Sequence, residues 1–167
     1  MLEIALDSDE EWDSSSFWLP LVRKAAEAAI AESEYPDLAE ADRPVEISVT
    51  LTGNGEVQAL NAKWRGKDRP TNVLSFPMAD ERDLAAANIA DAELLLGDIV
   101  LARGVCEAEA SDKGVSVADH AVHLVVHGTL HLLGYDHHDD RDAIDMEARE
   151  VRALKRLGIA NPYEVVA

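Results

Sequence analysis

The hydrophobic pattern along the chain predicts four strands. Residues 2–6 and residues 45–51 alternate between apolar and polar or small side chains, which is typical of strands with one buried face. Residues 72–76 form a short apolar segment that ends at Pro77. Residues 94–101 are almost continuously apolar, and this pattern favours a central strand that is buried on both faces.

Five segments have the spacing of helices. Ser116 and the two aspartates at 139–140 suit helix N-termini, whereas Gly114, Gly134 and Gly158 suit the residues that follow helices. The predicted helices cover about residues 15–31, 57–64, 103–112, 117–134 and 140–158. The apolar stripe of the last helix is predicted to consist of Ile144, Ala148, Val151 and Leu154.

The segments between these elements are polar or carry little pattern. Residues 36–43 are predicted to form a polar connection, residues 53–55 a turn and residues 78–93 a loop. The chain has no internal repeat and no linker that would divide it. Strands interleaved with helices therefore predict a single α+β domain over residues 1–167, with a small mixed sheet of about four strands and about five helices.

Composition restricts the class of protein further. The chain has 167 residues, of which 47% are hydrophobic and 29% charged, an ordinary balance for a globular domain. No apolar run approaches the roughly 20 residues that a membrane helix needs, and the acidic start does not resemble a secretory signal. Cys106 is the only cysteine, which suits a reducing compartment. We therefore expect a cytoplasmic protein.

The net charge of −18 argues against a general surface for polyanions. It results from 15 basic and 33 acidic residues, so phosphates would be repelled over most of the molecule. Nucleic acid could still bind at one local basic segment or be delivered by a partner. Such a segment exists, because four of the fifteen basic residues lie within residues 63–69. The alternative is a solvated turn of mixed charges, since Asp68 lies among them.

All six histidines lie between residues 120 and 138, where an even distribution would place roughly 0.7. His127 and His131 are four apart on a predicted helix, so their side chains share one face. Gly134 allows the backbone to leave the helix, and His137 can then return to the same ion. Three imidazoles with an open fourth position are typical of catalytic zinc sites. We therefore predict one divalent metal, with Zn²⁺ as the best candidate, on the long helix and the turn after it.

The other histidines allow several interpretations. Histidines can also pack in a core or cap a helix, but three at this spacing with an intervening glycine favour a metal. His120 and His123 continue the stripe and could support the ligands, contact substrate or pack, so they are left outside the metal set. His138 could compete with its neighbour His137, which the spacing favours.

One residue argues against a peptidase. Zinc peptidases of the H-E-x-x-H type place a glutamate, their general base, directly after the first histidine. Gly128 occupies that position here, although the spacing of the three histidines otherwise matches the metzincins. Zinc-dependent hydrolysis of a peptide or amide is therefore the weaker hypothesis.

Three stretches carry a family resemblance. They are HGTLHLLGYDH at residues 127–137, LNAKWRGKDRPTNVLSFP at residues 60–77 and LGDIV at residues 96–100. In content, order and separation they resemble the signatures of the YbeY family, single-strand-specific endoribonucleases that mature ribosomal RNA in bacteria. The first is highly specific and the other two are supportive. The resemblance covers roughly residues 45–160.

The resemblance implies both a site and a biological context. It implies a metal, usually taken as zinc, on His127, His131 and His137, and a functionally needed arginine that corresponds to Arg65. It further implies maturation of the 16S ribosomal RNA 3′ end and ribosome quality control. The implied partners are the ribosome, ribosomal proteins and a ribosome-assembly GTPase.

The basic segment fits the same chemistry. Arg65 could grip a phosphate and stabilise the charge that develops in phosphoryl transfer, and we predict it to be catalytic. Lys63, Lys67 and Arg69 are predicted to contact the RNA backbone beside it. The acidic charge keeps one alternative from a different class, a non-catalytic ribosome-assembly factor whose metal only stabilises the fold.

Overall fold

The sheet has four strands in the order β1-β2-β4-β3. In the computed structural model, which describes residues 1–86 and 93–164, they are β1 (Leu2–Ser8), β2 (Val45–Thr52), β3 (Val73–Pro77) and β4 (Leu94–Ala102). β1, β2 and β4 run parallel, whereas β3 pairs antiparallel with β4 at the edge. The mixed four-stranded sheet and the central position of the apolar strand β4 are confirmed, although Leu95 and Asp98 of β4 are exposed.

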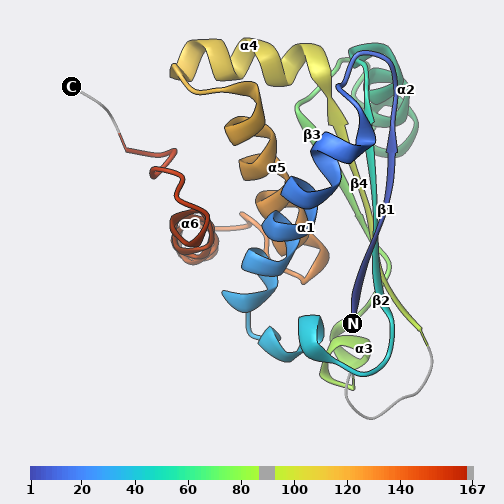
Figure 1. The fold of residues 1–167 in the computed structure, drawn as a ribbon, viewed down its shortest axis with the longest axis vertical. Coiled ribbons are helices and arrows are strands. Elements are labelled where there is room, and N and C mark those ends of the chain that lie inside the picture. Colours follow the sequence, from blue (N-terminus) through green and yellow to red (C-terminus); the bar gives the residue numbers. More distant parts are fainter. Residues whose placement is uncertain (87–92, 165–167) are drawn as a thin grey trace.

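Helices cover the two faces of this sheet unequally. Figure 1 shows α1 and α5 against one face, α6 outside them, and α2 at the opposite side of the sheet. The main core lies between the sheet, α1 and α5, and a second cluster lies under α2. The helices are α1 (Ser15–Ala31), the 3₁₀ helix η1 (Pro36–Glu40), α2 (Asn54–Arg65), α3 (Glu81–Ala85), α4 (Arg103–Lys113), α5 (Val117–Leu132) and α6 (Asp140–Arg156).

The predicted α+β class is confirmed, and three connections differ from their predictions. The predicted turn at residues 53–55 is wrong, because α2 begins at Asn54, whose side-chain oxygen accepts the N–H of Val105 at 3.0 Å. Residues 36–40 form η1, which starts at a proline. The predicted loop contains α3, capped reciprocally by Asp80 and Asp83, so the described residues hold six α-helices rather than about five. Residues 87–92 of that loop lie outside the described residues.

The predicted apolar stripe of α6 is wrong in one important respect. Ile144 is 68% exposed, whereas the buried positions are Met146, Glu150, Ala153 and Leu154. These positions follow the i, i+4, i+7, i+8 spacing of one helix face. A charged residue in the middle of the buried face conceals that face from a hydrophobicity pattern.

Two glycines bring α5 close to the sheet beside the edge strand β3. Gly97 has φ +143°, and a Cβ there would lie 2.3 Å from the carbonyl oxygen of Phe76. A Cβ on Gly128 of α5 would lie 3.1 Å from Ser75 Oγ and 3.1 Å from Ile99 Cγ2. The C-terminal half of α5 therefore lies directly beside β3, and this contact positions the site described below.

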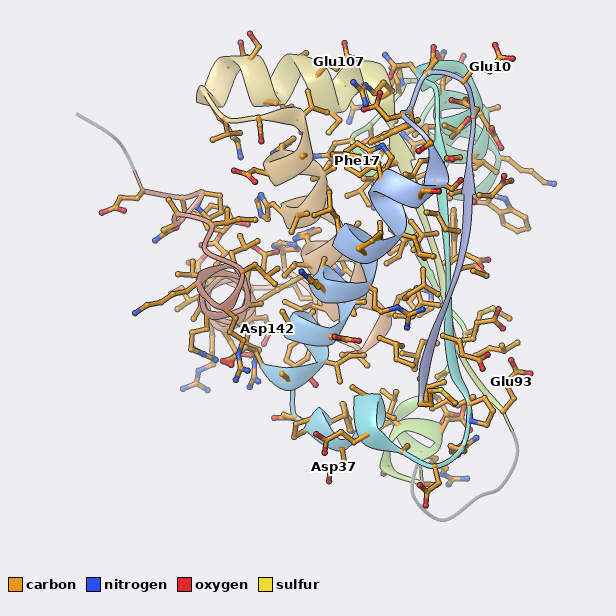
Figure 2. The ribbon with its side chains drawn as sticks, in the orientation of Figure 1. Glu10, Phe17, Asp37, Glu93, Glu107 and Asp142 are labelled. Atoms are coloured by element: carbon orange, nitrogen blue, oxygen red, sulfur yellow. The ribbon has the colours of Figure 1, made fainter. Side chains whose placement is uncertain are left out.

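The acidic side chains are spread over several elements. The labelled carboxylates in Figure 2 lie well apart in this view, and they belong to a turn (Glu10), η1 (Asp37), the residue before β4 (Glu93), the middle of α4 (Glu107) and the first turn of α6 (Asp142). This distribution agrees with the net charge of −18. Among the described residues, no helix combines the length and the apolar character that crossing a membrane requires.

Candidate metal centre

A cleft of about 520 Å³ opens beside the edge strand β3. Three parts of the chain form it: the end of α2, the segment from residue 71 to β3, and the end of α5 with the turn that follows. The residues that line it are Arg65, Thr71, Asn72, Val73, Ser75, Pro77, His127, His131, Gly134, Tyr135, Asp136 and His137. The three predicted metal ligands and the predicted catalytic arginine therefore share one cleft.

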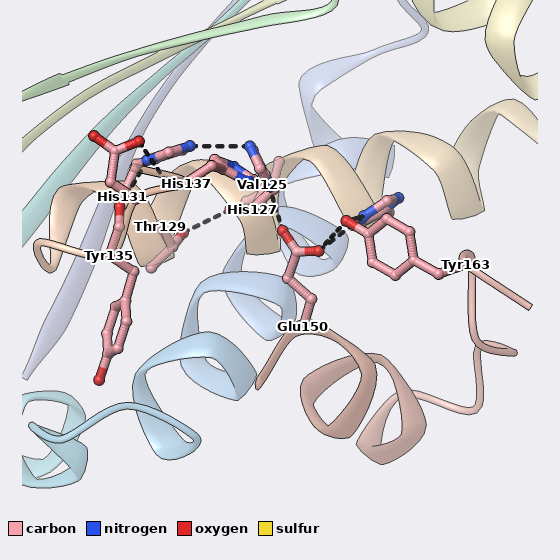
Figure 3. A network of polar contacts seen from close by, with 10 residues as sticks. Val125, His127, Thr129, His131, Tyr135, His137, Glu150 and Tyr163 are labelled. Carbon is pink, nitrogen blue, oxygen red and sulfur yellow. Dashed lines mark hydrogen bonds and ion pairs between the residues drawn. The ribbon is translucent and has the colours of Figure 1, made fainter. Parts of the chain in front are cut away.

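Helix α5 presents two of the histidines to the cleft. His127 and His131 follow one another on the same face, one turn apart, and their rings lie 4.5 Å apart between centroids. The two Nε2 atoms face each other at 3.0 Å (Figure 3). Two nitrogens that bind one Zn²⁺ tetrahedrally at 2.0–2.1 Å lie about 3.3 Å apart, so the spacing suits a shared cation.

Hydrogen bonds fix which ring nitrogen of each histidine is free. The Nδ1 of His131 lies 2.8 Å from the carbonyl oxygen of Tyr135, which can only accept a hydrogen bond. The Nδ1 of His127 contacts the carboxylate of Glu150. Each Nδ1 is therefore the donor of its bond, and a ring with no second proton presents the lone pair of Nε2 to the cleft.

The donor set fits a divalent metal. The two Nε2 atoms lie 3.0 Å apart, and when both rings are unprotonated there a cation can accept both lone pairs. One nitrogen of His137 joins them, because ligand atoms of His127, His131 and His137 all lie within 4.8 Å of one another. Imidazole nitrogens suit Zn²⁺ and also nickel, copper or iron. The residues thus fit the metal that the spacing predicts.

The turn after α5 brings His137 back to the helix. Gly134 has φ +97°, a left-handed conformation that favours glycine. The side chain of Asp136 then accepts the backbone N–H of His137 at 2.7 Å, and this bond holds the pKa of Asp136 below its ordinary value. The ring of His137 lies 5.1 Å from that of His127 and 5.2 Å from that of His131.

The environment keeps His131 neutral. Burial, together with the neighbouring His127, lowers the pKa of His131 to about 4. A metal ligand must be unprotonated, so this histidine is ready to bind a cation at neutral pH without first losing a proton.

Glu150 is the residue of this site that the sequence pattern missed. It lies on α6, is fully buried, and contacts His127, His123 and the hydroxyl of Tyr163 (Figure 3). Burial alone would raise its pKa, but the hydrogen bonds from His123, His127 and Tyr163 outweigh burial and lower the pKa to about 2. The one sequence signal for it is its position on the same helix face as Met146, Ala153 and Leu154, and a charged residue does not register in a hydrophobic pattern.

The structure also shows what the other three histidines do. His120 is buried, and its Nε2 lies 2.8 Å from an oxygen of Glu109. His123 is buried against Tyr163 and Glu150. His138 is exposed and lies 3.1 Å from Asp136. None of the three lines the cleft or joins the ligand cluster of the described residues.

The basic segment lies partly at the cleft and partly away from it. Arg65 ends α2 and lines the cleft. Lys63, Lys67 and Arg69 are exposed and do not line it; the Lys63 ammonium lies 4.9 Å from the ring centroid of Trp64. The roles of all four residues in RNA binding stay predictions.

Close packing explains the absence of the peptidase glutamate. The position of Gly128 faces Ser75 and Ile99 at distances that leave a Cβ little room. A glutamate there would require the Ser75 or Ile99 side chains to give by a few tenths of an ångström. The tight contact therefore disfavours the general base of an H-E-x-x-H peptidase at this position.

Comparisons with known proteins agree with the geometry. A family model described as "Endoribonuclease YbeY" matches residues 8–158. The protein of that name from Sphingopyxis alaskensis is 52% identical over 165 residues, 98% of each chain, and that from Rhizorhabdus wittichii is 48% identical over 167 residues, 99% of this chain and 98% of the relative. The solution structure of TM1509 from Thermotoga maritima covers 99% of this chain and 100% of its own, with a TM-score of 0.54 at 23% identity. This last likeness concerns the fold alone.

Proposed function

The chain belongs to the endoribonuclease YbeY family, and on this premise we propose that it is a metal-dependent endoribonuclease that cuts single-stranded RNA. One observation carries the proposal: three imidazole rings converge in a cleft that also holds an arginine. His127, His131 and His137 would hold the metal, with Zn²⁺ as the best candidate. When bound there, the cation supplies a Lewis acid for a phosphodiester oxygen.

The side chains around the cleft account for phosphate binding. Arg65 can donate two parallel hydrogen bonds to one phosphate and offset negative charge that develops during cleavage. Thr71 and Ser75 line the same cleft, and their hydroxyl groups can donate further hydrogen bonds. These groups orient the scissile phosphate against the histidine cluster, and this orientation is the main contribution of the protein.

The charge of the molecule favours a single strand over a duplex. A duplex carries two phosphate backbones, and a surface with a net charge of −18 repels them over a large area. A single strand can present one phosphate to Arg65 and leave most of its backbone away from the protein. The same charge suits an RNA that a larger partner presents to the enzyme.

We extend the proposal to the biological context that the family resemblance implies. The substrate would be ribosomal RNA, with the 16S 3′ end as its site of maturation, and the enzyme would also act in ribosome quality control. Its partners would be the ribosome, ribosomal proteins and a ribosome-assembly GTPase in the cytoplasm. The negative charge supports this context, because a partner that holds the RNA removes the need for a basic docking surface.

A cleavage assay with labelled RNA tests the enzyme. We expect the Zn²⁺-loaded protein to cut a single-stranded ribosomal RNA fragment faster than the same fragment in a duplex. We expect Arg65→Ala to lower kcat about 100-fold, the cost of losing one donor to a developing oxyanion. Arg82→Ala removes another exposed arginine that does not line the cleft and serves as the matched control.

Two outcomes would contradict the proposal in different ways. No cleavage by a metal-loaded, folded wild-type protein would favour the non-catalytic assembly factor. Equal cleavage by the wild type and by His127→Ala at matched purity would indicate a contaminating nuclease. A casein assay in parallel tests the peptidase hypothesis, for which we expect no activity because of Gly128.

A further inference from the structure

Glu150 connects the last long helix to the histidine cluster. Its side chain is fully buried, and it extends from α6 toward the face of α5 that carries His123 and His127 (Figure 3). One oxygen, Oε1, accepts the Nδ1–H of His127. Because a carboxylate oxygen is a strong acceptor, this bond favours the ring form with the proton on Nδ1 and the lone pair on Nε2.

The second oxygen of Glu150 is held independently. Oε2 accepts the hydroxyl of Tyr163, a residue of the segment that follows α6, and lies 3.5 Å from Nε2 of His123. The ring of Tyr163 packs edge-on against His123, with centroids 5.6 Å apart. With both oxygens occupied, the carboxylate cannot rotate freely about its last bond, so the direction of Oε1 toward His127 is fixed.

We propose that Glu150 is a positioning residue for the metal centre: it holds His127 in the ring orientation and protonation form that direct Nε2 into the cleft, and Tyr163 holds Glu150. The inference rests on the proposed metal-dependent function. The segment after α6 is thereby part of the metal centre, although it lies outside the cleft. Carboxylates that bind the outer nitrogen of a histidine ligand in this way orient the ring and raise its basicity.

A second glutamate–histidine pair on α5 supplies a matched comparison. Glu109 of α4 accepts from His120 Nε2 at 2.8 Å and from Asn72 Nδ2 at 2.9 Å. The substitution Glu109→Gln removes the same kind of charge as Glu150→Gln. Glu109, however, contacts none of the three predicted ligands. A substitution there measures the general cost of losing a glutamate beside a histidine of α5.

The test is the Zn²⁺ affinity of the metal-free full-length protein, measured by competition with a chromophoric chelator. We expect Glu150→Gln to weaken Zn²⁺ binding by about 10- to 100-fold and Tyr163→Phe by about fivefold. We expect Glu109→Gln to bind Zn²⁺ as the wild type does. A purely structural role for Glu150 would lower the Tm of the metal-free variant and leave the Zn²⁺ affinity of its folded fraction unchanged, and this result would overturn the proposal.

A measurement on the wild type covers the case in which Glu150→Gln does not fold. Ring ¹⁵N chemical shifts report which nitrogen of a neutral histidine carries the proton. We expect the metal-free wild type to show His127 with the proton on Nδ1. A proton on Nε2, or rapid exchange between the two forms, would overturn the proposal.

The outcomes separate this inference from the proposed function. If the wild type itself binds no divalent metal, then the metal-dependent function fails. If the wild type binds Zn²⁺ and Glu150→Gln binds it equally well, then only the role of Glu150 fails.

Discussion

The two halves of helix α5 use the same residue type differently. His120 and His123 in the first half are 3% and 6% exposed, and His120 pairs with Glu109 away from the cleft. His127 and His131 in the second half line the cleft with their Nε2 atoms 3.0 Å apart. All four lie on one stripe at spacings of three or four residues.

The difference between the halves follows from their neighbours. The first half lies against α4, α6 and the segment after α6, where His120 contacts Glu109 and His123 contacts Glu150 and Tyr163. The second half ends beside the edge strand β3, where Gly128 allows close packing. Spacing therefore identifies a candidate ligand, but access to a cleft and the partner of the outer nitrogen decide whether it becomes one.

Zn²⁺ affinity should respond most strongly to substitution, and it distinguishes the two halves of α5 directly. His131→Ala removes a predicted ligand, and we expect its Zn²⁺ affinity to fall by more than about 100-fold, since losing only the partner of a ligand costs up to that much. His120→Ala should bind Zn²⁺ within about threefold of the wild type but lose ~1–3 kcal/mol in the free energy of unfolding, because a buried ring and its hydrogen bond with Glu109 are lost. Metal competition and urea denaturation measure both. Equal loss of metal in the two variants would show that the halves do not differ.

An intermediate effect concerns pH. The pKa of His131 is lowered from its ordinary value of 6.5 to about 4, and that of His120 is also lowered, in both cases first by burial. Between these values the unfolded chain binds more protons than the folded one. The free energy of unfolding of the metal-free protein should therefore keep its full value above pH 6.5 and decrease as the pH falls toward 4.

Urea denaturation in the presence of a chelator measures this dependence. For one proton, the slope approaches ~1.4 kcal/mol per pH unit. The lowered pKa of Glu150 acts only below its ordinary value of 4.5, so it contributes little in this window. We expect His131→Ala to have a smaller slope than the wild type, and an unchanged slope would contradict the burial of a neutral His131.

The smallest expected effect concerns the basic segment. Lys67 is exposed and outside the cleft, so Lys67→Ala should raise the KM for single-stranded RNA by less than about threefold and slightly reduce its salt dependence. Lys113→Ala, on α4, is the matched control and should leave the salt dependence as it is. A large increase in KM with Lys67→Ala would contradict this and would indicate that the RNA runs along the end of α2 rather than through the cleft.

Local sequence patterns predicted most of the fold and the three candidate ligands that the structure brings together. The strict alternation in β2, the apolar run in β4 and the caps of α5 and α6 are signals that lie within each element. The elements that were missed, η1 and α3, are five residues long, too short to show a helical period. The buried face of α6 was misjudged because a charged residue lies at its centre, and burial of that charge depends on partners from other elements.

The four strands, the negative charge and a helix whose histidines, with the glycine turn after them, can converge on one ion are all encoded locally in the sequence. These features depend on periods of two and 3.6 residues and on the conformational freedom of glycine, which act over a few neighbouring positions. Packing between distant elements brought Arg65 into the cleft and placed Glu150, 23 residues along the chain, on His127. Contacts of this kind arise when packed helices and strands meet, and no local period encodes them.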